Sequence, residues 1–174
     1  MTVSTEIKKR GTYLGYFIVG EKLVNGKDGL RSHQALLFTE APGMKRRDYI
    51  AMGDIVYGMY VAESLKKIGK AGGKNGWAGR VGTYASDPAR EPTNAKILRV
   101  MDEEFEAGTT IEVYGFSVPK AQSEYFCTIT NETLHFEVEQ HGNVEEHLTS
   151  EALEEGEDLI FCTQLKWGYY ERIN

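Results

Sequence analysis

Four side chains, at positions 57, 67, 80 and 84, are of types that suit a reaction on a negatively charged group such as a phosphate. Tyr57 and Lys67 lie ten residues apart, and Arg80 and Tyr84 follow at the spacing of one helical turn. An ammonium beside a phenol favours the phenolate and lowers its pKa from the ordinary value of about 10. A guanidinium binds phosphate oxygens better than an ammonium does, because its donors form a planar fork. Together these groups predict proton transfer beside a bound phosphate.

Each of these residues also has an ordinary structural interpretation. Tyr57 could be a half-buried strand aromatic, and Arg80 could be a solvated side chain on an exposed helix. Lys67 could belong to a charge pair that protects an edge strand from aggregation. Taken singly, those interpretations are favoured. The occurrence of all the groups in this order favours one joint active site instead.

Apolar runs separated by turn-forming residues predict the strands that would position these groups. Strand pairs are expected within residues 12–40, 55–72 and 125–139. A strong single strand is expected at 110–119, and a closing strand at 158–164. The second pair would place Tyr57 and Lys67 on adjacent strands.

Three helices are expected, at residues 77–85, 93–107 and 143–155. The first places Arg80 and Tyr84 on one face. Mostly antiparallel strands with helices packed on them define an α+β fold, with a small central sheet, an added N-terminal strand pair and an inserted hairpin.

Two further segments are expected as loops. Residues 41–48 contain a basic cluster, and residues 69–76 read GKAGGKNG. The second segment lacks the GK[ST] ending of a nucleotide-binding loop, so we do not interpret it as a nucleotide site.

The charge distribution bears on the kind of partner. A net charge of −6 argues at first against nucleic acid, because phosphate contacts need a surplus of Lys and Arg. However, residues 45–100 hold eleven basic and five acidic side chains, a local charge of +6, whereas residues 101–174 hold three basic and seventeen acidic ones. A basic groove on an acidic body would give this pattern, and so would a chance distribution of solvated charges.

The remaining composition favours one soluble domain. A length of 174 residues allows one sizeable core. No apolar run is long enough for a membrane span, and the start lacks the apolar centre of a secretory signal, so we expect a cytoplasmic protein. Cys127 and Cys162 are expected to be ordinary buried thiols. The histidines are scattered and are not expected to bind metal: His33, His135, His141 and His147.

The segment from residue 55 to residue 84 resembles the GIY-YIG nucleases. Ile55-Val56-Tyr57 stands where their first triplet belongs, and Lys67-Ile68-Gly69 stands ten positions later, where the second belongs. The second triplet has Lys in place of Tyr, and the first lacks its Gly. A Lys at this place is most similar to the short type II restriction endonucleases. The resemblance extends over about residues 50–165, through Thr93-Asn94, the strand at 111–116 and Cys162-Thr163-Gln164.

This resemblance implies roles for particular residues. Tyr57, with Lys67 beside it, would accept a proton from the attacking water or hold that water in line, and Arg80 would bind the scissile phosphate. Tyr84 would complete the helix face. Glu145, with Glu146 as the alternative, would hold one Mg²⁺ or a substituting Mn²⁺, since Mg²⁺ needs only one protein carboxylate beside water and phosphate oxygens. The residues expected to contact DNA are Lys70, Lys74 and Asn75.

The implied function is site-specific cleavage of double-stranded DNA by a Mg²⁺-dependent endonuclease. A homodimer is expected if the target is palindromic. Two alternatives remain: a phage or mobile-element endonuclease of looser specificity, and a non-catalytic DNA-binding module. The implied organisation is an N-terminal β extension at 1–45, a nuclease core at 46–165 and a tail at 166–174. The extension and the tail are expected to supply dimer contacts or base recognition.

Overall fold

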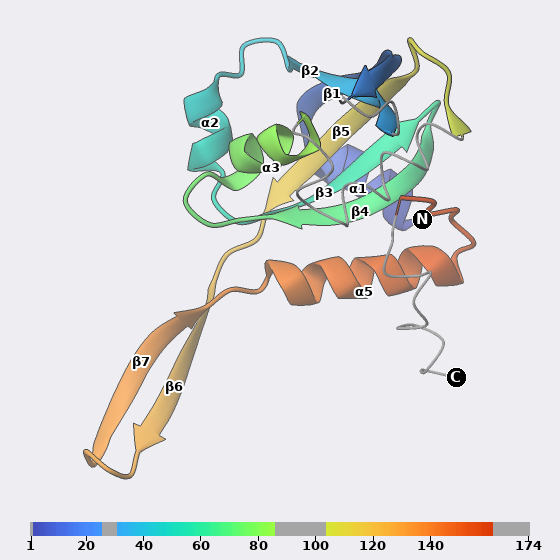
Figure 1. Ribbon diagram of the computed structural model, residues 1–174. Coiled ribbons are helices and arrows are strands. Elements are labelled where there is room, and N and C mark those ends of the chain that lie inside the picture. The colour runs from blue at the N-terminus through green and yellow to red at the C-terminus, as the bar shows by residue number, and fades with distance from the viewer. Residues whose placement is uncertain (1, 26–30, 86–103, 162–174) are drawn as a thin grey trace.

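The computed structural model describes residues 2–25, 31–85 and 104–161, and its centre is a five-stranded sheet (Figure 1). The strands lie in the order β2-β1-β5-β3-β4, and every neighbouring pair is antiparallel. Their bounds are Thr12–Asn25 for β1, Arg31–Glu40 for β2, Ile55–Val61 for β3, Ser64–Ala71 for β4 and Thr110–Ser117 for β5. With helices packed on it, this sheet confirms the predicted α+β class.

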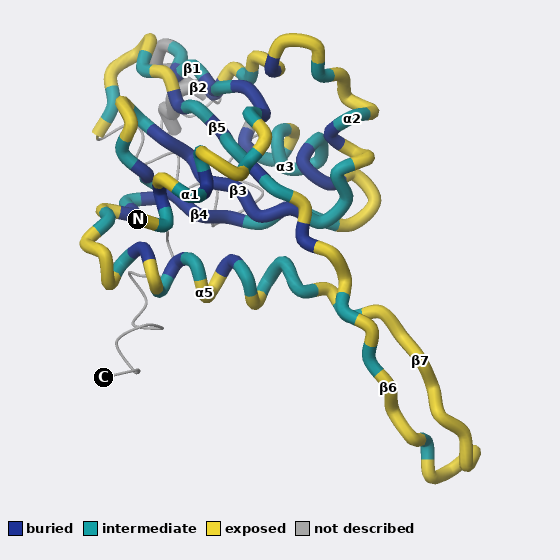
Figure 2. The backbone as a smooth tube through the Cα atoms, turned by 180° about the vertical axis from the view of Figure 1, so that it is seen from behind, coloured by how far each residue is buried: buried dark blue, intermediate teal, exposed yellow. Residues whose placement is uncertain are grey.

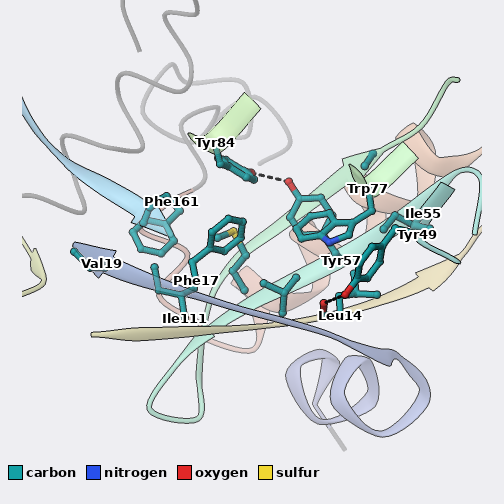
Figure 3. Close-up of a cluster of buried hydrophobic side chains, with 14 residues drawn as sticks. Leu14, Phe17, Val19, Tyr49, Ile55, Tyr57, Trp77, Tyr84, Ile111 and Phe161 are labelled. Atoms are coloured by element: carbon teal, nitrogen blue, oxygen red, sulfur yellow. Dashed lines mark hydrogen bonds between the residues drawn. The ribbon is translucent and has the colours of Figure 1, made fainter. Parts of the chain in front are cut away.

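Helices cover both faces of the sheet. Their bounds are Val3–Arg10 for α1, Arg46–Ala51 for α2, Gly76–Ala85 for α3 and His141–Glu154 for α5. Tyr49 of α2 and Trp77 of α3 belong to one buried cluster, drawn in Figure 3. Ile7 of α1 and Ala152 of α5 belong to a second cluster, built on alternate residues of the same strands. The sheet is therefore the middle layer of three.

Strand β3 is buried from end to end. Residues 55–60 are all buried, and Figure 2 shows this strand in dark blue at the centre of the molecule. Because helices cover both faces, an uninterrupted apolar run is favoured over an alternating one. The chain turns into β4 through Ala62 and Glu63, whose φ angles of 45° and 73° are those of a type I′ hairpin turn. The second predicted strand pair is confirmed.

The N-terminal strands are part of the central sheet. The sequence predicts an added N-terminal strand pair, and residues 12–18 of β1 pair with β5. Leu14, Phe17 and Val19 are completely buried there. This pairing joins segments far apart in the chain, and local sequence patterns do not record it.

Two helices form where the sequence predicts none. The Thr2 hydroxyl caps α1 by accepting a hydrogen bond from the backbone N–H of Thr5. That helix buries only Ser4 and Ile7, so it shows little apolar periodicity. Helix α2 begins within the segment expected as a loop and extends beyond it, and the Asp48 carboxylate accepts a hydrogen bond from the backbone N–H of Lys45, which precedes the helix. Polar caps rather than apolar spacing start both helices.

The predicted inserted hairpin is present, and it projects from the body as an arm (Figures 1 and 2). The arm consists of β6, Ala121–Cys127, and β7, Glu132–Val138, and most of its side chains are exposed. Cys127 is only partly buried at the end of β6, so the prediction of a core thiol there is wrong. Cys162 lies outside the described residues.

The C-terminal part of the prediction is confirmed only for its helix. Helix α5 is present, although it begins at His141 rather than at Asn143. Residues 158–161 were expected to open a strand, but no strand is assigned to them, and Leu159 and Phe161 are buried. Most of the helix expected at 93–107, the end of the closing strand and the tail lie outside the described residues. Among the helices that are described, none has the length and apolar character needed to cross a membrane.

Candidate active site

Tyr57 lies in the middle of β3 and points toward α3 (Figure 3). Its ring centroid is 4.8 Å from that of Trp77, and its hydroxyl oxygen is 2.6 Å from the hydroxyl oxygen of Tyr84. Both tyrosines are buried, with exposed fractions of 1% and 2%. One of the two hydroxyls donates to the other, so the two phenols form a single hydrogen-bonded unit.

The protonation state of Tyr57 differs from the prediction. Burial raises the pKa of Tyr57 well above its ordinary value, and the neighbouring phenol of Tyr84 raises it further. The guanidinium of Arg80 acts in the opposite direction and is outweighed. The sequence predicts that Lys67 lowers the pKa of Tyr57, and this prediction is wrong. The cost of desolvating a phenolate exceeds the attraction of the nearby guanidinium of Arg80. At neutral pH the phenol of Tyr57 is therefore protonated.

Lys67 lies on β4, on the same face of the sheet as Tyr57. The strand register pairs Lys67 with Met59, two residues along β3 from Tyr57, so the lysine and the tyrosine are diagonal neighbours. Lys67 is 8% exposed, so most of its side chain is buried. A positive charge in this position suits a bound anion.

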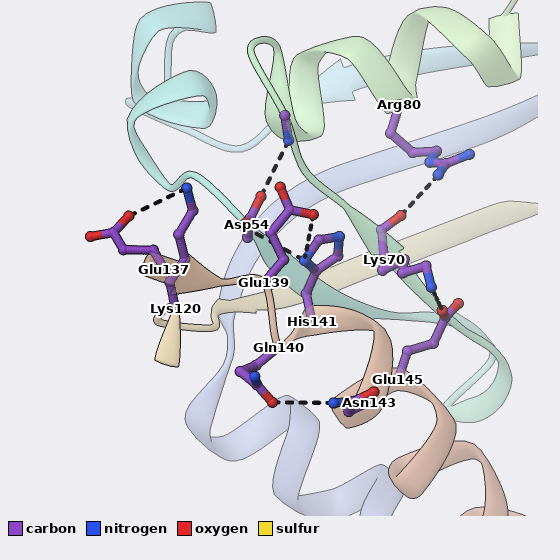
Figure 4. Close-up of polar contacts among 11 residues, drawn as sticks. Asp54, Lys70, Arg80, Lys120, Glu137, Glu139, Gln140, His141, Asn143 and Glu145 are labelled. Atoms are coloured by element: carbon purple, nitrogen blue, oxygen red, sulfur yellow. Dashed lines mark hydrogen bonds and ion pairs between the residues drawn. The ribbon is translucent and has the colours of Figure 1, made fainter. Parts of the chain in front are cut away.

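Arg80 lies on α3, the helix that the sequence predicts, one turn before Tyr84. The two side chains diverge: the phenol enters the core, while the guanidinium extends to β4 and donates a hydrogen bond of 3.0 Å to the carbonyl oxygen of Lys70 (Figure 4). A hollow of 430 Å³ opens beside it, and its lining includes Lys74 and Asn75. Arg80 thus lies between the buried phenols and an open, polar surface.

Glu145 reaches the same strand from α5. Its carboxylate forms an ion pair of 3.2 Å with the ammonium of Lys70, and its side chain is 10% exposed (Figure 4). Its negative charge also acts to raise the pKa of Tyr57. Glu146 is exposed. A single buried carboxylate fits Mg²⁺ in donor type and number, because this ion prefers oxygen and keeps several waters.

The three residues expected to contact DNA are placed differently. Lys74 and Asn75 are exposed in the loop between β4 and α3, beside Arg80. The ammonium of Lys70 forms an ion pair with Glu145, so in the absence of DNA it contacts that carboxylate.

One group of polar residues has no counterpart in the sequence prediction. Asp54, Glu139 and His141 place one potential ligand atom each within 4.8 Å of one another. Asp54 precedes β3, while the other two lie just before and at the start of α5. No motif connects them, because only the folded sheet brings the two segments together. The sequence predicts no metal ligand among the histidines, but within the described residues His141 belongs to such a group.

Gly69 makes room for the phenol of Tyr57, and this gives a test of the site's packing. The register pairs the two residues, and a Cβ at position 69 would lie 2.6 Å from the Cζ and hydroxyl oxygen of that tyrosine. We expect Gly69→Ala to lower the free energy of unfolding by about 1–3 kcal/mol through overpacking, as measured by urea denaturation. The control is Gly82→Ala in α3, where an added Cβ meets nothing within 4 Å. That variant should gain roughly 0.5–1 kcal/mol, and equal effects at both positions would contradict the packing argument.

The comparisons with known proteins identify similar solved structures and no family. No protein-family model matches the chain, and no curated protein matches it. The restriction endonuclease HPY188I in complex with product DNA is similar at 16% identity, with a TM-score of 0.46, over 91% of this chain and 83% of the other. A mutant of bacteriophage T4 EndoII is similar at 14% identity, with a TM-score of 0.38, over 89% and 95%. At this level of similarity neither structure assigns a function to the chain.

Proposed function

We propose that this protein is a divalent-metal-dependent endonuclease that hydrolyses phosphodiester bonds in double-stranded DNA at a specific site. One observation carries the proposal: Arg80, from α3, and Glu145, from α5, both contact Lys70 of β4, the strand that pairs with the strand of Tyr57. A buried phenol and a guanidinium from the α3 side of the sheet and a carboxylate from the α5 side thereby meet at the edge strand β4, and Lys67 lies on the same face as the phenol. These are the groups that the sequence predicts to act together on a phosphate.

The roles follow from the geometry and charge of each group. In this reaction the hydroxyl of Tyr57 would donate its hydrogen bond to the hydroxyl of Tyr84 and accept one from the attacking water, which it would hold in line without removing a proton. Arg80 binds the non-bridging oxygens of the scissile phosphate. Lys67 adds a second positive charge beside the phosphate, where negative charge increases as the bond breaks.

Glu145 would hold the divalent ion, with Lys70 fixing its carboxylate from the other side. When bound, such an ion neutralises charge on the phosphate and makes a coordinated water more acidic. Glu146, which is exposed, is the alternative ligand.

The DNA backbone would lie along the hollow beside Arg80. Lys74 and Asn75 are exposed on its rim and can contact phosphates on either side of the cut. The acidic C-terminal half of the chain keeps the duplex on this basic side. If the target is palindromic, two copies of the chain would act as a homodimer, one on each strand.

The decisive experiment incubates the purified protein with plasmid DNA in Mg²⁺, in Mn²⁺ and in EDTA. We expect discrete fragments with either ion and none with EDTA, because the reaction needs the ion's charge. A smear would indicate an endonuclease of looser specificity. DNA that is bound but stays uncut in every condition would indicate a binding module and would contradict the proposal. Undiminished cutting in EDTA would also contradict it.

A further inference from the structure

A second group of ligand atoms lies one helical turn from Glu145, and the proposed reaction uses none of it. The group consists of Asp54, Glu139 and His141 (Figure 4). Nδ1 of His141 is 3.7 Å from Oδ2 of Asp54 and 4.0 Å from Oε2 of Glu139. Residues four apart on a helix share a face, so His141 and Glu145 project from the same side of α5. Two neighbouring polar groups therefore occupy this end of the sheet.

Two atoms of the group, Oδ2 of Asp54 and Nδ1 of His141, are buried and form no hydrogen bond with the described residues. The side chains of Asp54 and His141 are 8% and 12% exposed. Oδ2 of Asp54 and Nδ1 of His141 have no hydrogen-bond partner among the described residues, and they face each other at a distance too long for a hydrogen bond. Buried polar atoms normally have a partner, because leaving them unpaired is costly. A partner located between them would remove that cost.

The spacing and chemistry of these atoms fit a metal ion. Metal–ligand distances of about 2.0–2.2 Å put two ligands of a tetrahedral ion roughly 3.4 Å apart. The two separations from Nδ1 of His141, 3.7 Å and 4.0 Å, are slightly longer than this, and all three ligand atoms lie within 4.8 Å of one another. One imidazole with two carboxylates is a donor set typical of Zn²⁺ or Mn²⁺, whereas Mg²⁺ prefers oxygen alone.

We propose that Asp54, Glu139 and His141 bind one transition-metal ion of the zinc or manganese class, at a site distinct from the ion position at Glu145. The ion would join the start of β3 to the first turn of α5. Oδ1 of Asp54 also accepts a hydrogen bond of 3.2 Å from the backbone N–H of Gly73, so the loop after β4 is part of the same assembly. The site would thereby position the turn of α5 that carries Glu145. The inference does not depend on the proposed nuclease activity, since it uses none of the residues assigned to cutting.

The test uses Co²⁺ as a spectroscopic probe, titrated into the metal-free full-length protein. We expect one equivalent to bind with visible d–d absorption, and Zn²⁺ to displace it. His141→Ala and Asp54→Asn should each weaken binding on the order of 100-fold or more. The asparagine keeps an oxygen for the Gly73 hydrogen bond, and circular dichroism checks that both variants are folded.

Two control variants separate this site from its surroundings. His147→Ala removes an exposed histidine of the same helix, and Glu145→Gln removes the carboxylate assigned to Mg²⁺. Both should bind Co²⁺ as the parent protein does, and Zn²⁺ should raise their melting temperature but not that of His141→Ala. Retained binding in His141→Ala, lost binding in Glu145→Gln, or no binding at millimolar Co²⁺ would each overturn the inference. Because Glu145→Gln is expected to be inactive in cutting, binding there is scored independently of nuclease activity.

Discussion

Replacement of Arg80 with alanine should reduce DNA cleavage on the order of 10³-fold while the protein stays folded. The guanidinium is the group best placed to bind the scissile phosphate, and removing a positioned charge of this kind from an active site costs about 10²–10³-fold in rate. Its one hydrogen bond within the described protein goes to the carbonyl of Lys70, so the loss in stability should be about 1 kcal/mol. Cleavage of a labelled duplex under single-turnover conditions measures the effect.

Two further substitutions make the Arg80 experiment specific. Arg80→Lys keeps the charge but not the planar fork, so it should recover only part of the lost rate. Arg47→Ala removes an exposed arginine of α2 that pairs with its neighbour Asp48, and it should cut normally. If Arg80→Ala cut within threefold of the parent protein, the guanidinium would have no part in the reaction.

Tyr57→Phe should lower the cleavage rate about 10²-fold, because the attacking water loses the oxygen that aligns it. Burial raises the pKa of Tyr57, so its phenol stays protonated from pH 6 to pH 9. The ratio of parent to variant rates should therefore be constant across that range. A phenolate acting as the base would instead make this ratio rise about tenfold for each pH unit. The measurement is the pH profile of both proteins with Mg²⁺ present.

The stability of the Tyr57 variant needs its own control. Losing that hydroxyl leaves the buried hydroxyl of Tyr84 without its partner, which should cost about 1–3 kcal/mol of unfolding free energy. Tyr49→Phe removes a comparable buried hydroxyl, one that donates to the carbonyl of Leu14, and it should lose stability without losing activity. Similar rate losses in both variants would show that the effect of Tyr57→Phe is structural.

The local elements could be predicted from the sequence, because each is encoded within a short segment. The β3–β4 hairpin is marked by apolar runs on both sides of a tight turn, and α3 is marked by the spacing of its residues. These two elements carry Tyr57, Lys67 and Arg80, so the sequence predicts which elements hold these three side chains.

Features that depend on distant contacts could not be predicted. The pairing of β1 with β5 joins segments about a hundred residues apart, and no local pattern indicates it. The direction of the Tyr57 pKa shift depends on how completely α3 and Gly69 enclose the phenol, and a sequence does not record burial. The Asp54 and His141 group was missed for the same reason, since those residues meet only when α5 packs beside β3.

The arm formed by β6 and β7 is attached to the body at one place, because its first and last paired residues, Ala121 and Val138, lie opposite each other. Its two ends could therefore be joined by a few residues without moving β5 or α5. We expect replacement of the arm to have little effect on the chemistry beside β4, and a different hairpin could be grafted at the same junction.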